Sequence, residues 1–488
     1  MKINEIPLGL SFDDVLLVPQ FSEIKSRSHI STRSHLAGDL FLNVPIISSN
    51  MDSVTMHEMA IAMSKLGGIG FIHRFLSIEE QCDEIMKVKR YRSHIIEDPY
   101  TIQEDALIEE AQKMIKIFKV GGLLIAKNGQ LHGILTERDI YGADPASKVS
   151  EIMTPRDKMV VGDFHINIKE AEKMMHSLRV EKLPLVNDDN QITGLIVMKD
   201  IKKLTSNPLS SLDKSGKLLV GASVGVVKDY LDRAEASLEA GADLLVIDVA
   251  HGHIKHVYDA VKEIKARFKE TPLIAGNVAT AEGIQYLRQA GVDAIRVGIG
   301  CGSSCVTRLV AGAGVPQLTA ILECGLMANK LGIPIIADGG IRAGSADMPG
   351  GADLAKAIGA GASTVMLGSA LAACQESPGK VEERNGRLVK TYRGMASIDA
   401  NISKNRKEGA VGEDLLKVEK YYVAEGITAT IPYKNESAAD VVYKLIGGLR
   451  SGMSYSNAQT IPDFHRNAKF IRQTQAGIGE SKPHILDR

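Results

Sequence analysis

From Lys217 onward, short apolar runs alternate with amphipathic segments of helical periodicity. The apolar runs are Leu219–Val224, Leu244–Asp248, Leu273–Asn277, Ala294–Gly298, Ile335–Asp338 and Thr364–Gly368. The helix-like segments are Val227–Ala240, Ile254–Phe268, Ala281–Ala290, Leu318–Leu331 and Asp353–Gly359. Because strands that read as nearly continuous apolar runs are buried on both faces, this alternation predicts a parallel sheet covered by helices.

Two further strands are predicted near the N-terminus, at Val44–Ser48 and Ile69–Ile72, with a helix at Met56–Leu66 between them. Together with the six later runs they make eight strand–helix units. That is the number in a TIM (β/α)8 barrel, an α/β fold of about 250 residues. An open, doubly wound sheet is the alternative architecture for the same alternation.

The stretch from about Ile95 to Leu204 interrupts the barrel pattern and carries an internal repeat. Gly133–Ile140 and Gly194–Ile201 match at a constant offset, and each follows an amphipathic helix and an apolar strand. A duplicated module inserted into a barrel loop is the simplest account of this repeat. The chain then divides into an N-terminal part of the barrel at 1–92, the inserted pair at 93–207 and a C-terminal part of the barrel at 208–488.

The repeat resembles a pair of CBS modules, a tandem (Bateman) regulatory domain that often binds adenine or guanine nucleotides. The resemblance implies that ATP, GTP or GMP binds here, and that Asp139 and Asp200 contact the ribose. The alternative for each aspartate is a solvated acid in a turn.

Composition limits the classes of partner. The 58 Lys and Arg nearly balance the 59 Asp and Glu, and a net charge of −1 argues against nucleic acid or a membrane surface as a partner. No apolar run is long enough to cross a bilayer, and Met1–Glu5 has no apolar targeting segment, so we expect a cytoplasmic protein. The five cysteines include no Cys-x-x-Cys pair, which argues against a zinc site.

The segment Val297–Arg308, after the sixth predicted barrel strand, is the strongest candidate for chemistry. Barrel active sites form from the loops at this end of the strands. Its glycines let the backbone turn tightly, so the loop can hold an anion through amides or a monovalent cation through carbonyls. Cys305 is the candidate nucleophile, and Thr307 lies within reach of the same site. The alternative is that Cys305 is a buried packing residue.

Two later loops have the character of phosphate sites. Ala337–Gly340 follows the seventh predicted strand and Leu367–Ser369 follows the eighth, and barrels commonly bind phosphate in the loops after these strands. Asp338, at a strand end, suits a pair of ribose hydroxyls. The long polar stretch Asn401–Lys420 predicts a lid that excludes water, with a disordered surface loop as the alternative.

These loops and others resemble the IMP dehydrogenase and GMP reductase superfamily, and the likeness covers nearly the whole chain. The matching segments are Leu10–Val15, Ser49–Asp52, Gly67–Gly70, Ala275–Val278, the Cys305 loop, Ile336–Gly340 and Tyr392–Met395. The inserted pair lies where that family carries CBS modules. The family resemblance also implies a homo-oligomer, either a tetramer formed through the barrel or an octamer joined through CBS pairs.

The resemblance implies a role for each matching residue. Cys305 would attack C2 of a purine nucleoside monophosphate, GMP or IMP, and form a covalent adduct, with Thr307 and Glu425 as further catalytic residues. The nucleotide would be held by Ser49, Met51, Ser303, Asp338, Gly340, Gly368, Ser369, Tyr392, Gly394, Met395 and Glu425. The nicotinamide cofactor would contact Asp248, Val249, Ala250, Asn277 and Gly298. Potassium, in the dehydrogenases, would be held by the carbonyls of Gly300, Gly302 and Cys305.

Two reactions fit these residues. Dehydrogenases of the family convert IMP to XMP with NAD and hydrolyse the adduct with an Arg-Tyr pair in the lid, but here no tyrosine follows Arg406. Reductases convert GMP to IMP and ammonia with NADPH, and Asp248–Ala250 and Glu323–Cys324 resemble reductase sequences. Without a base to activate water, hydrolysis has no evident agent. We therefore predict a GMP reductase that uses NADPH, with an IMP dehydrogenase that uses NAD as the alternative.

Several features depart from familiar reductases. Animal and enterobacterial reductases lack CBS modules and have a shorter lid. Ile398 replaces the glutamate that partners the threonine in deamination, so Asp399 or Glu425 would have to substitute. Cys301 stands where proline or serine is usual, and Gly344–Gly351 lengthens the loop after the seventh strand.

A hypothesis of another class is a nucleotide-sensing protein with a catalytically inactive barrel. The intact Cys305, Thr307, Asp338 and Tyr392 argue against it. Binding of ATP or GTP without hydride transfer from either nucleotide would favour it.

Overall fold

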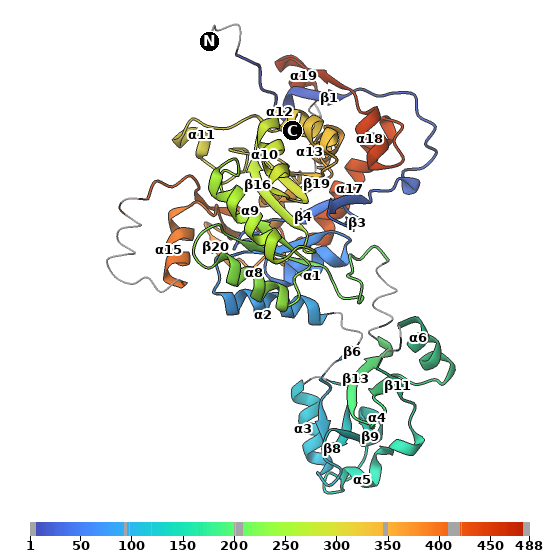
Figure 1. The fold of residues 1–488 in the computed structure, drawn as a ribbon. Coiled ribbons are helices and arrows are strands. Elements are labelled where there is room, and N and C mark those ends of the chain that lie inside the picture. Colours follow the sequence, from blue (N-terminus) through green and yellow to red (C-terminus); the bar gives the residue numbers. More distant parts are fainter. Residues whose placement is uncertain are drawn as a thin grey trace. The chain divides into compact units, whose positions relative to one another are not determined.

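The computed structural model describes residues 6–91, 95–96, 98–118, 120–164, 166, 168–199, 201, 208–344, 350–407, 420 and 422–481. The chain forms two compact units (Figure 1). One unit combines Met1–Tyr91 with Leu209–Arg488, and the other is Arg92–Pro208. Within the described ranges, no helix is both long and apolar enough to cross a membrane.

Eight parallel strands close into a barrel in the larger unit, in the order β14-β15-β16-β17-β18-β19-β4-β5. Their bounds are β4 (Ile46–Ser48), β5 (Ile69–Ile72), β14 (Val220–Val224), β15 (Leu244–Ile247), β16 (Leu273–Val278), β17 (Ala294–Val297), β18 (Ile335–Asp338) and β19 (Thr364–Leu367). The predicted TIM barrel is confirmed, and the open doubly wound sheet is excluded. β4 starts at Ile46, later than predicted, because Pro45 has no amide proton to donate to the sheet.

Helices alternate with the strands and cover the outside of the barrel (Figure 1). They are α1 (His57–Lys65), α2 (Ile78–Tyr91), α8 (Tyr230–Glu239), α9 (Lys255–Arg267), α10 (Ala281–Ala290), α12 (Gln317–Leu331), α13 (Ala352–Gly359) and α17 (Ala438–Tyr455). α8 starts later than predicted because Lys228 has a left-handed φ of 60°, which a right-handed helix cannot contain.

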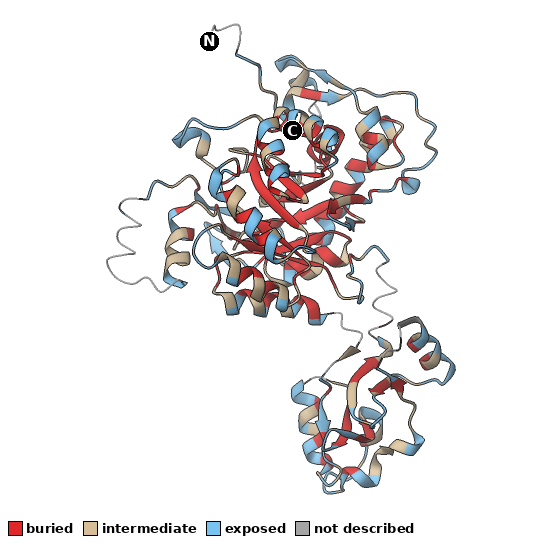
Figure 2. Ribbon diagram, in the orientation of Figure 1, coloured by how far each residue is buried: buried red, intermediate tan, exposed pale blue. Residues whose placement is uncertain are grey.

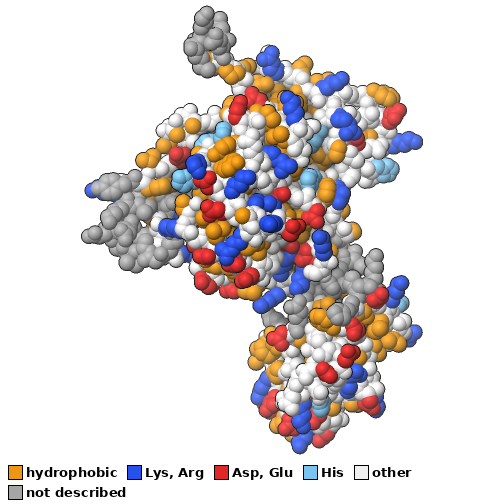
Figure 3. Space-filling model, viewed as in Figure 1, with side chains coloured by type: hydrophobic (Ala, Val, Ile, Leu, Met, Phe, Trp, Pro, Cys, Tyr) orange, Lys and Arg blue, Asp and Glu red, His pale blue; other side chains and the backbone are white. Residues whose placement is uncertain are grey.

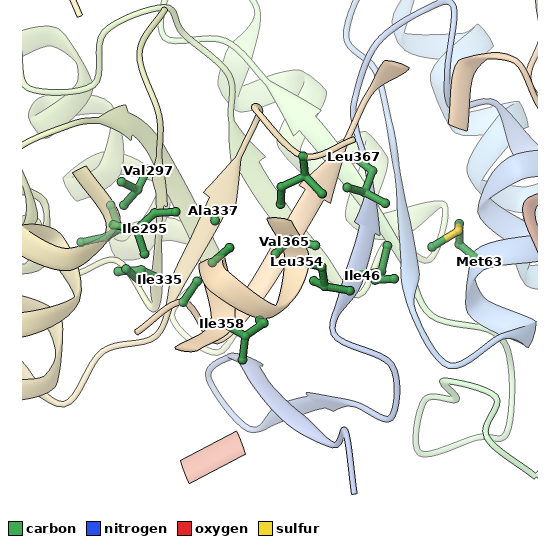
Figure 4. Close-up of a cluster of buried hydrophobic side chains, with 14 of the residues drawn as sticks. Ile46, Met63, Ile295, Val297, Ile335, Ala337, Leu354, Ile358, Val365 and Leu367 are labelled. Carbon is green, nitrogen blue, oxygen red and sulfur yellow. The ribbon is translucent and has the colours of Figure 1, made fainter. Parts of the chain in front are cut away.

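Alternate residues of each barrel strand enter two separate cores. Inward-facing side chains such as Ile47, Phe71 and Met366 fill the barrel interior. The outward-facing side chains pack against the helices. Figure 4 shows Ile295, Val297, Ile335, Ala337, Val365 and Leu367 near Leu354 and Ile358 of α13. Both faces of the strands are buried (Figure 2), which explains why the strands read as unbroken apolar runs.

Shorter elements follow the barrel strands toward the C-terminus. α11 (Thr307–Val310) comes directly after Cys305, and α14 (Ser369–Ala372) follows β19. An antiparallel sheet then forms in the order β20-β21-β22, from Val381–Arg384, Arg387–Arg393 and Thr428–Pro432. Between the last two strands, the first part of the predicted lid is not a loop but the helix α15 (Ile398–Lys407).

The smaller unit contains two copies of one strand–helix–strand–strand module. The first copy is β7 (Thr101–Ile102), α3 (Ile108–Phe118), β8 (Gly122–Lys127) and β9 (Gln130–Thr136). The second is β11 (Gly162–Asp163), α6 (Ile168–Ser177), β12 (Lys182–Val186) and β13 (Ile192–Val197). In each copy the first two strands pair in parallel and the last two antiparallel, as expected for a duplicated module of the CBS type.

Charged side chains of both signs are interspersed on the face drawn in Figure 3. This distribution follows from a sequence with 58 basic and 59 acidic residues. Recognition of a charged ligand therefore rests on local sites such as the loops at the barrel mouth rather than on bulk charge.

Phe71 offers a test of the barrel core, because its side chain is 0% exposed and a Cβ on Gly221 would lie only 2.3 Å from its ring. We expect Phe71→Ala to lower the free energy of unfolding by about 3–5 kcal/mol, measured by chemical denaturation. The matched control is Phe21→Ala, since Phe21 is 83% exposed and its loss should cost less than about 0.5 kcal/mol. Equal effects of the two substitutions would contradict this packing.

Candidate active site

A single cavity of about 680 Å³ opens at the C-terminal ends of the barrel strands. It is lined by the predicted catalytic, nucleotide, cofactor and cation residues of the barrel unit, but not by Asp399, the other candidate acid. The predicted catalytic residues there are Cys305, Thr307 and Glu425. The predicted nucleotide contacts there are Ser49, Met51, Ser303, Asp338, Gly340, Gly368, Ser369, Tyr392, Gly394 and Met395. The predicted cofactor and cation residues there are Asp248, Val249, Ala250, Asn277, Gly298, Gly300 and Gly302.

Cys305, Thr307 and Glu425 form a continuous chain of contacts. The Thr307 Oγ1 hydroxyl donates to Glu425 Oε2 at 2.7 Å, and Cys305 Sγ lies 3.2 Å from the same Oγ1. Because the single hydroxyl proton of Thr307 is directed at Glu425, the thiol is the donor in the contact between Cys305 and Thr307. The arrangement therefore provides a path for a proton from the sulfur to the carboxylate.

Backbone hydrogen bonds hold this chain of contacts in place. Cys305 and Gly426 form an isolated antiparallel bridge. On either side of it, the Val306 amide donates to the Glu425 carbonyl at 2.8 Å, and the Ile427 amide donates to the Ser304 carbonyl at 2.9 Å. Glu425 thus reaches Thr307 because the end of the lid pairs with the loop that carries the cysteine.

The Gly394–Ser397 turn contacts the end of the lid as well, next to its pairing with the Cys305 loop. The Gly394 amide donates to the Ile427 carbonyl at 3.0 Å. A Cβ on Gly426 would lie 3.0 Å from the Ser397 amide nitrogen, so the close approach of the two segments requires glycine there. The lid end, this turn and the Cys305 loop consequently form one unit.

A buried cation lies in the floor of the cavity. Arg296, only 5% exposed, contacts Asp248 at 3.2 Å and Asp338 at 2.7 Å. Burial works against ionisation of Asp248, but the guanidinium groups of Arg296 and Arg74 outweigh it and hold the pKa of that carboxyl below its usual value. The arginine connects the side predicted to bind cofactor with the side predicted to bind ribose.

Arg296 was not among the residues singled out from the sequence. A signal was present, because an arginine in the otherwise apolar strand Ala294–Val297 must be paired when it is buried. Tyr422 and Lys404 of the lid also line the cavity and were missed. Lys404 lies in the polar lid stretch and Tyr422 lies just after it, and neither position gives a periodic signal.

Asn277, like Arg296, contacts Asp338, and its side-chain oxygen suits a hydrogen bond from the amide of a cofactor. Its Nδ2 donates to the Gly298 carbonyl and to Asp338 Oδ2, both at 2.8 Å. Among the residues that the structure describes, none donates to its buried Oδ1. An unpaired buried acceptor beside Asp248 and Val249 suits the carboxamide N–H of a nicotinamide.

At the other end of the cavity, Tyr392 lies against the residues predicted to bind phosphate. Its hydroxyl is 3.4 Å from Ser303 Oγ and 3.7 Å from the Met51 sulfur. A Cβ on Gly368 would lie 2.9 Å from this hydroxyl, so a side chain there would displace the Tyr392 hydroxyl. Ser303, Gly368 and Tyr392 therefore converge on one point of the wall.

The predicted potassium ligands lie together in the loop, but one is already engaged. The Gly302 carbonyl accepts the Cys305 amide at 3.0 Å, which leaves it one further lone pair for a cation. Gly300 has a φ of 78°, a backbone conformation open to glycine. Potassium binding by Gly300, Gly302 and Cys305 stays a prediction.

The two candidate ribose ligands of the inserted pair lie outside the barrel unit. Asp139 caps the short helix α4 (Glu137–Ile140), and its Oδ2 accepts from the Thr136 amide at 2.8 Å and hydroxyl at 2.7 Å. Its other oxygen is the one available for a ribose. Asp200 lies outside the described residues.

Comparison with known proteins identifies relatives over nearly the full length. A family model described as IMP dehydrogenase / GMP reductase domain matches residues 9–484. The inosine-5'-monophosphate dehydrogenase of Nitrosopumilus maritimus is 47% identical over 98% of this chain and 99% of its own. The GMP reductase of Leishmania major is 42% identical over 100% of this chain and 99% of its own. A crystal structure of a GMP reductase variant from Trypanosoma brucei in complex with guanosine 5'-monophosphate superimposes with a TM-score of 0.90 at 43% identity, covering 99% of this chain and 98% of that chain.

The thiols offer a test of the site. Burial raises the pKa values of Cys301, Cys324 and Cys374 to about 12, so at pH 8 only on the order of one such thiol in 10,000 is a thiolate. We expect iodoacetamide to modify Cys305 before these three thiols, with the rates measured by peptide mass spectrometry. Cys305→Ser should remove this early product and leave the other rates unchanged. Equally rapid modification of Cys301 would contradict the assignment.

Proposed function

The chain belongs to the IMP dehydrogenase / GMP reductase family, and within it we propose that this protein is a GMP reductase that converts GMP and NADPH to IMP, NADP⁺ and ammonia. The family establishes an oxidoreductase acting on purine nucleotides with a nicotinamide cofactor. The choice of the reductase rests on the groups that surround the sulfur of Cys305.

In the proposed reaction, Cys305 gives its proton to the Thr307–Glu425 pair and attacks C2 of GMP. A carbon–sulfur bond forms, and the proton returns through Thr307 to the 2-amino group, which leaves as ammonia while the C2–nitrogen bond breaks. Bound NADPH supplies the hydride that reaches C2. Cys305 then leaves as a thiolate and IMP is released.

The observation that carries the proposal is the 2.7 Å hydrogen bond from Thr307 to Glu425 beside the Cys305 sulfur. An amino group is a poor leaving group unless its nitrogen is protonated so that it departs as ammonia, and a reductase therefore needs an acid within reach of C2. The sequence left Asp399 and Glu425 as candidates for this partner. Glu425 is the one that contacts Thr307.

The lid supports the same choice. Lys407, the residue after Arg406, pairs with Glu80 of α2 at 2.6 Å. Arg393 at the base of the lid pairs with Asp52 and donates to Ser403 at 3.2 Å. These contacts bind α15 to the barrel, where Asn401 and Lys404 line the cavity. The lid helix thus covers the cavity. Its sequence has no tyrosine after Arg406, so it offers no Arg-Tyr pair to activate water.

An IMP dehydrogenase is the second candidate, since a relative of that name is 47% identical to this chain. In that reaction IMP and NAD give XMP and NADH. We also propose that purine nucleotides bind the inserted CBS-type modules and that the protein forms a homo-oligomer.

One assay separates the two reactions. We expect GMP-dependent oxidation of NADPH, followed at the absorbance of the reduced nicotinamide, and release of ammonia. Cys305→Ala should abolish turnover while GMP binding is retained. Formation of NADH from IMP, NAD and potassium at a higher rate would overturn the reductase proposal.

The proton path has its own test. Glu425→Gln removes the acid and should lower kcat for GMP reduction by about 100-fold or more, with a much smaller change in KM. Thr307→Ala combined with it should add little, because the two residues act as one unit. Asp399→Asn, the matched control, should retain near-normal kcat. A larger loss of kcat in Asp399→Asn than in Glu425→Gln would show that Asp399, and not Glu425, is the acid.

A further inference from the structure

Lys390 of β21 is a buried ammonium that the proposed reaction does not use. Its side chain is only 2% exposed. Nζ donates to the carbonyls of Cys374 at 2.6 Å and Ser377 at 3.0 Å, and to Ser377 Oγ at 2.9 Å. The Gln375 carbonyl lies at 3.5 Å. All four neighbours are uncharged oxygens, so the ammonium is held by dipoles and not by a carboxylate.

Such a site costs free energy to form, because an ammonium loses its water on burial. A norleucine-like apolar chain would fill the same space without this cost. The oxygens around Nζ would then lose their charged donor, although the Cys374 carbonyl would still accept from Ser377 Oγ at 3.0 Å. The ammonium is therefore best explained by the segment that it fixes, Cys374–Ser377, which directly follows α14.

α14 connects this segment with the cavity. Its first residue, Ser369, lines the cavity, and Cys374 extends its last turn through a hydrogen bond to the Leu371 carbonyl at 3.0 Å. Ser377 Oγ also donates to the Ala372 carbonyl at 2.6 Å. Lys390 thus holds the end of α14 that lies away from the cavity.

Tyr392 lies on the same face of β21. The burial pattern of the strand makes Lys390 and Tyr392 its two buried residues, and side chains two positions apart point to the same side. The Tyr392 hydroxyl contacts Ser303 and lies close to Gly368, the residue before α14. One strand face therefore contacts both ends of the short helix.

We propose that Lys390 is the positioning residue of the phosphate end of the cavity. Its ammonium fixes α14 against β21, so that Ser369 and the Tyr392 hydroxyl face one point at which the 5'-phosphate is held. The inference rests on the nucleoside monophosphate site of the proposed function, and it assigns Lys390 no contact with the substrate.

The first test separates phosphate from base recognition. Lys390→Met should weaken GMP binding about tenfold, because α14 would no longer be fixed and the phosphate contact of Ser369 would be weakened. It should leave guanosine binding within about twofold, and both affinities are measured by calorimetry. KM for GMP should rise while KM for NADPH and kcat change little. Equal weakening of GMP and guanosine, or unchanged GMP binding, would overturn the proposal.

A matched control is Lys89→Met. Lys89 is 8% exposed and pairs with Asp213 and Asp243, at the N-terminal end of the barrel strands. This change should lower stability without altering the ratio of GMP to guanosine affinity. Because binding is measured without turnover, failure of the reductase assay and failure of this inference are distinguishable.

The second test is chemical rescue. Lys390→Ala removes the ammonium and leaves the four oxygens without their donor. Ethylammonium should restore KM for GMP toward the native value, whereas choline, which has no N–H, should not. Rescue by both cations, or by neither, contradicts a role for the ammonium in holding α14.

Discussion

The backbone pairing of the Cys305 loop with the end of the lid is the constraint on which the active site depends. Three loops meet there, around Cys305, Gly394 and Gly426, and each bonds to the next through main-chain groups. Main-chain pairing fixes position without depending on side-chain rotamers. It brings together Thr307 and Glu425, which are 118 residues apart in sequence. Any motion of the lid that broke the bridge would also separate the acid from the sulfur. Lid position and proton transfer are therefore parts of one equilibrium.

The charged floor of the cavity follows a different principle. Arg296 lies between Asp248 and Asp338 on three strands of the barrel. A buried charge pair gains little net stability, because the loss of water offsets the attraction. Its consequence is geometric. With one carboxylate on each side, the guanidinium fixes the position of both aspartates relative to the strands. The nucleotide side and the cofactor side then keep a constant separation across the point where hydride transfer is proposed.

The barrel could be predicted from the sequence because it depends on local pattern, whereas most residues of the site were named from the family resemblance. Buried strands read as apolar runs, and residues at strand ends share one face. Glu425 was named, yet its choice over Asp399 could not be made, since it depends on backbone pairing between distant loops. Arg296 was missed because a strand was interpreted only for its apolar character. Asp139 was named for its motif, but the Thr-x-x-Asp spacing that it forms with Thr136 is a local capping-box signal, and this signal was overlooked.

In the proposed mechanism the lid decides which reaction follows the adduct, and the energies of its contacts indicate how. The pair of Lys407 and Glu80 is half exposed, at 38% and 50%, and such pairs contribute at most about 1 kcal/mol. Its effect is therefore on position, because it holds the end of α15 against α2. Asp52, 10% exposed, pairs with Arg393 where less water reaches the charges, so their attraction is screened less. Hydrolysis needs a base aimed at water, and two of the lid cations are engaged with the barrel instead, Lys404 over the Phe75 ring and Lys407 with Glu80. Release of ammonia needs only a proton, and the residues that supply it lie on the loops that the backbone already joins.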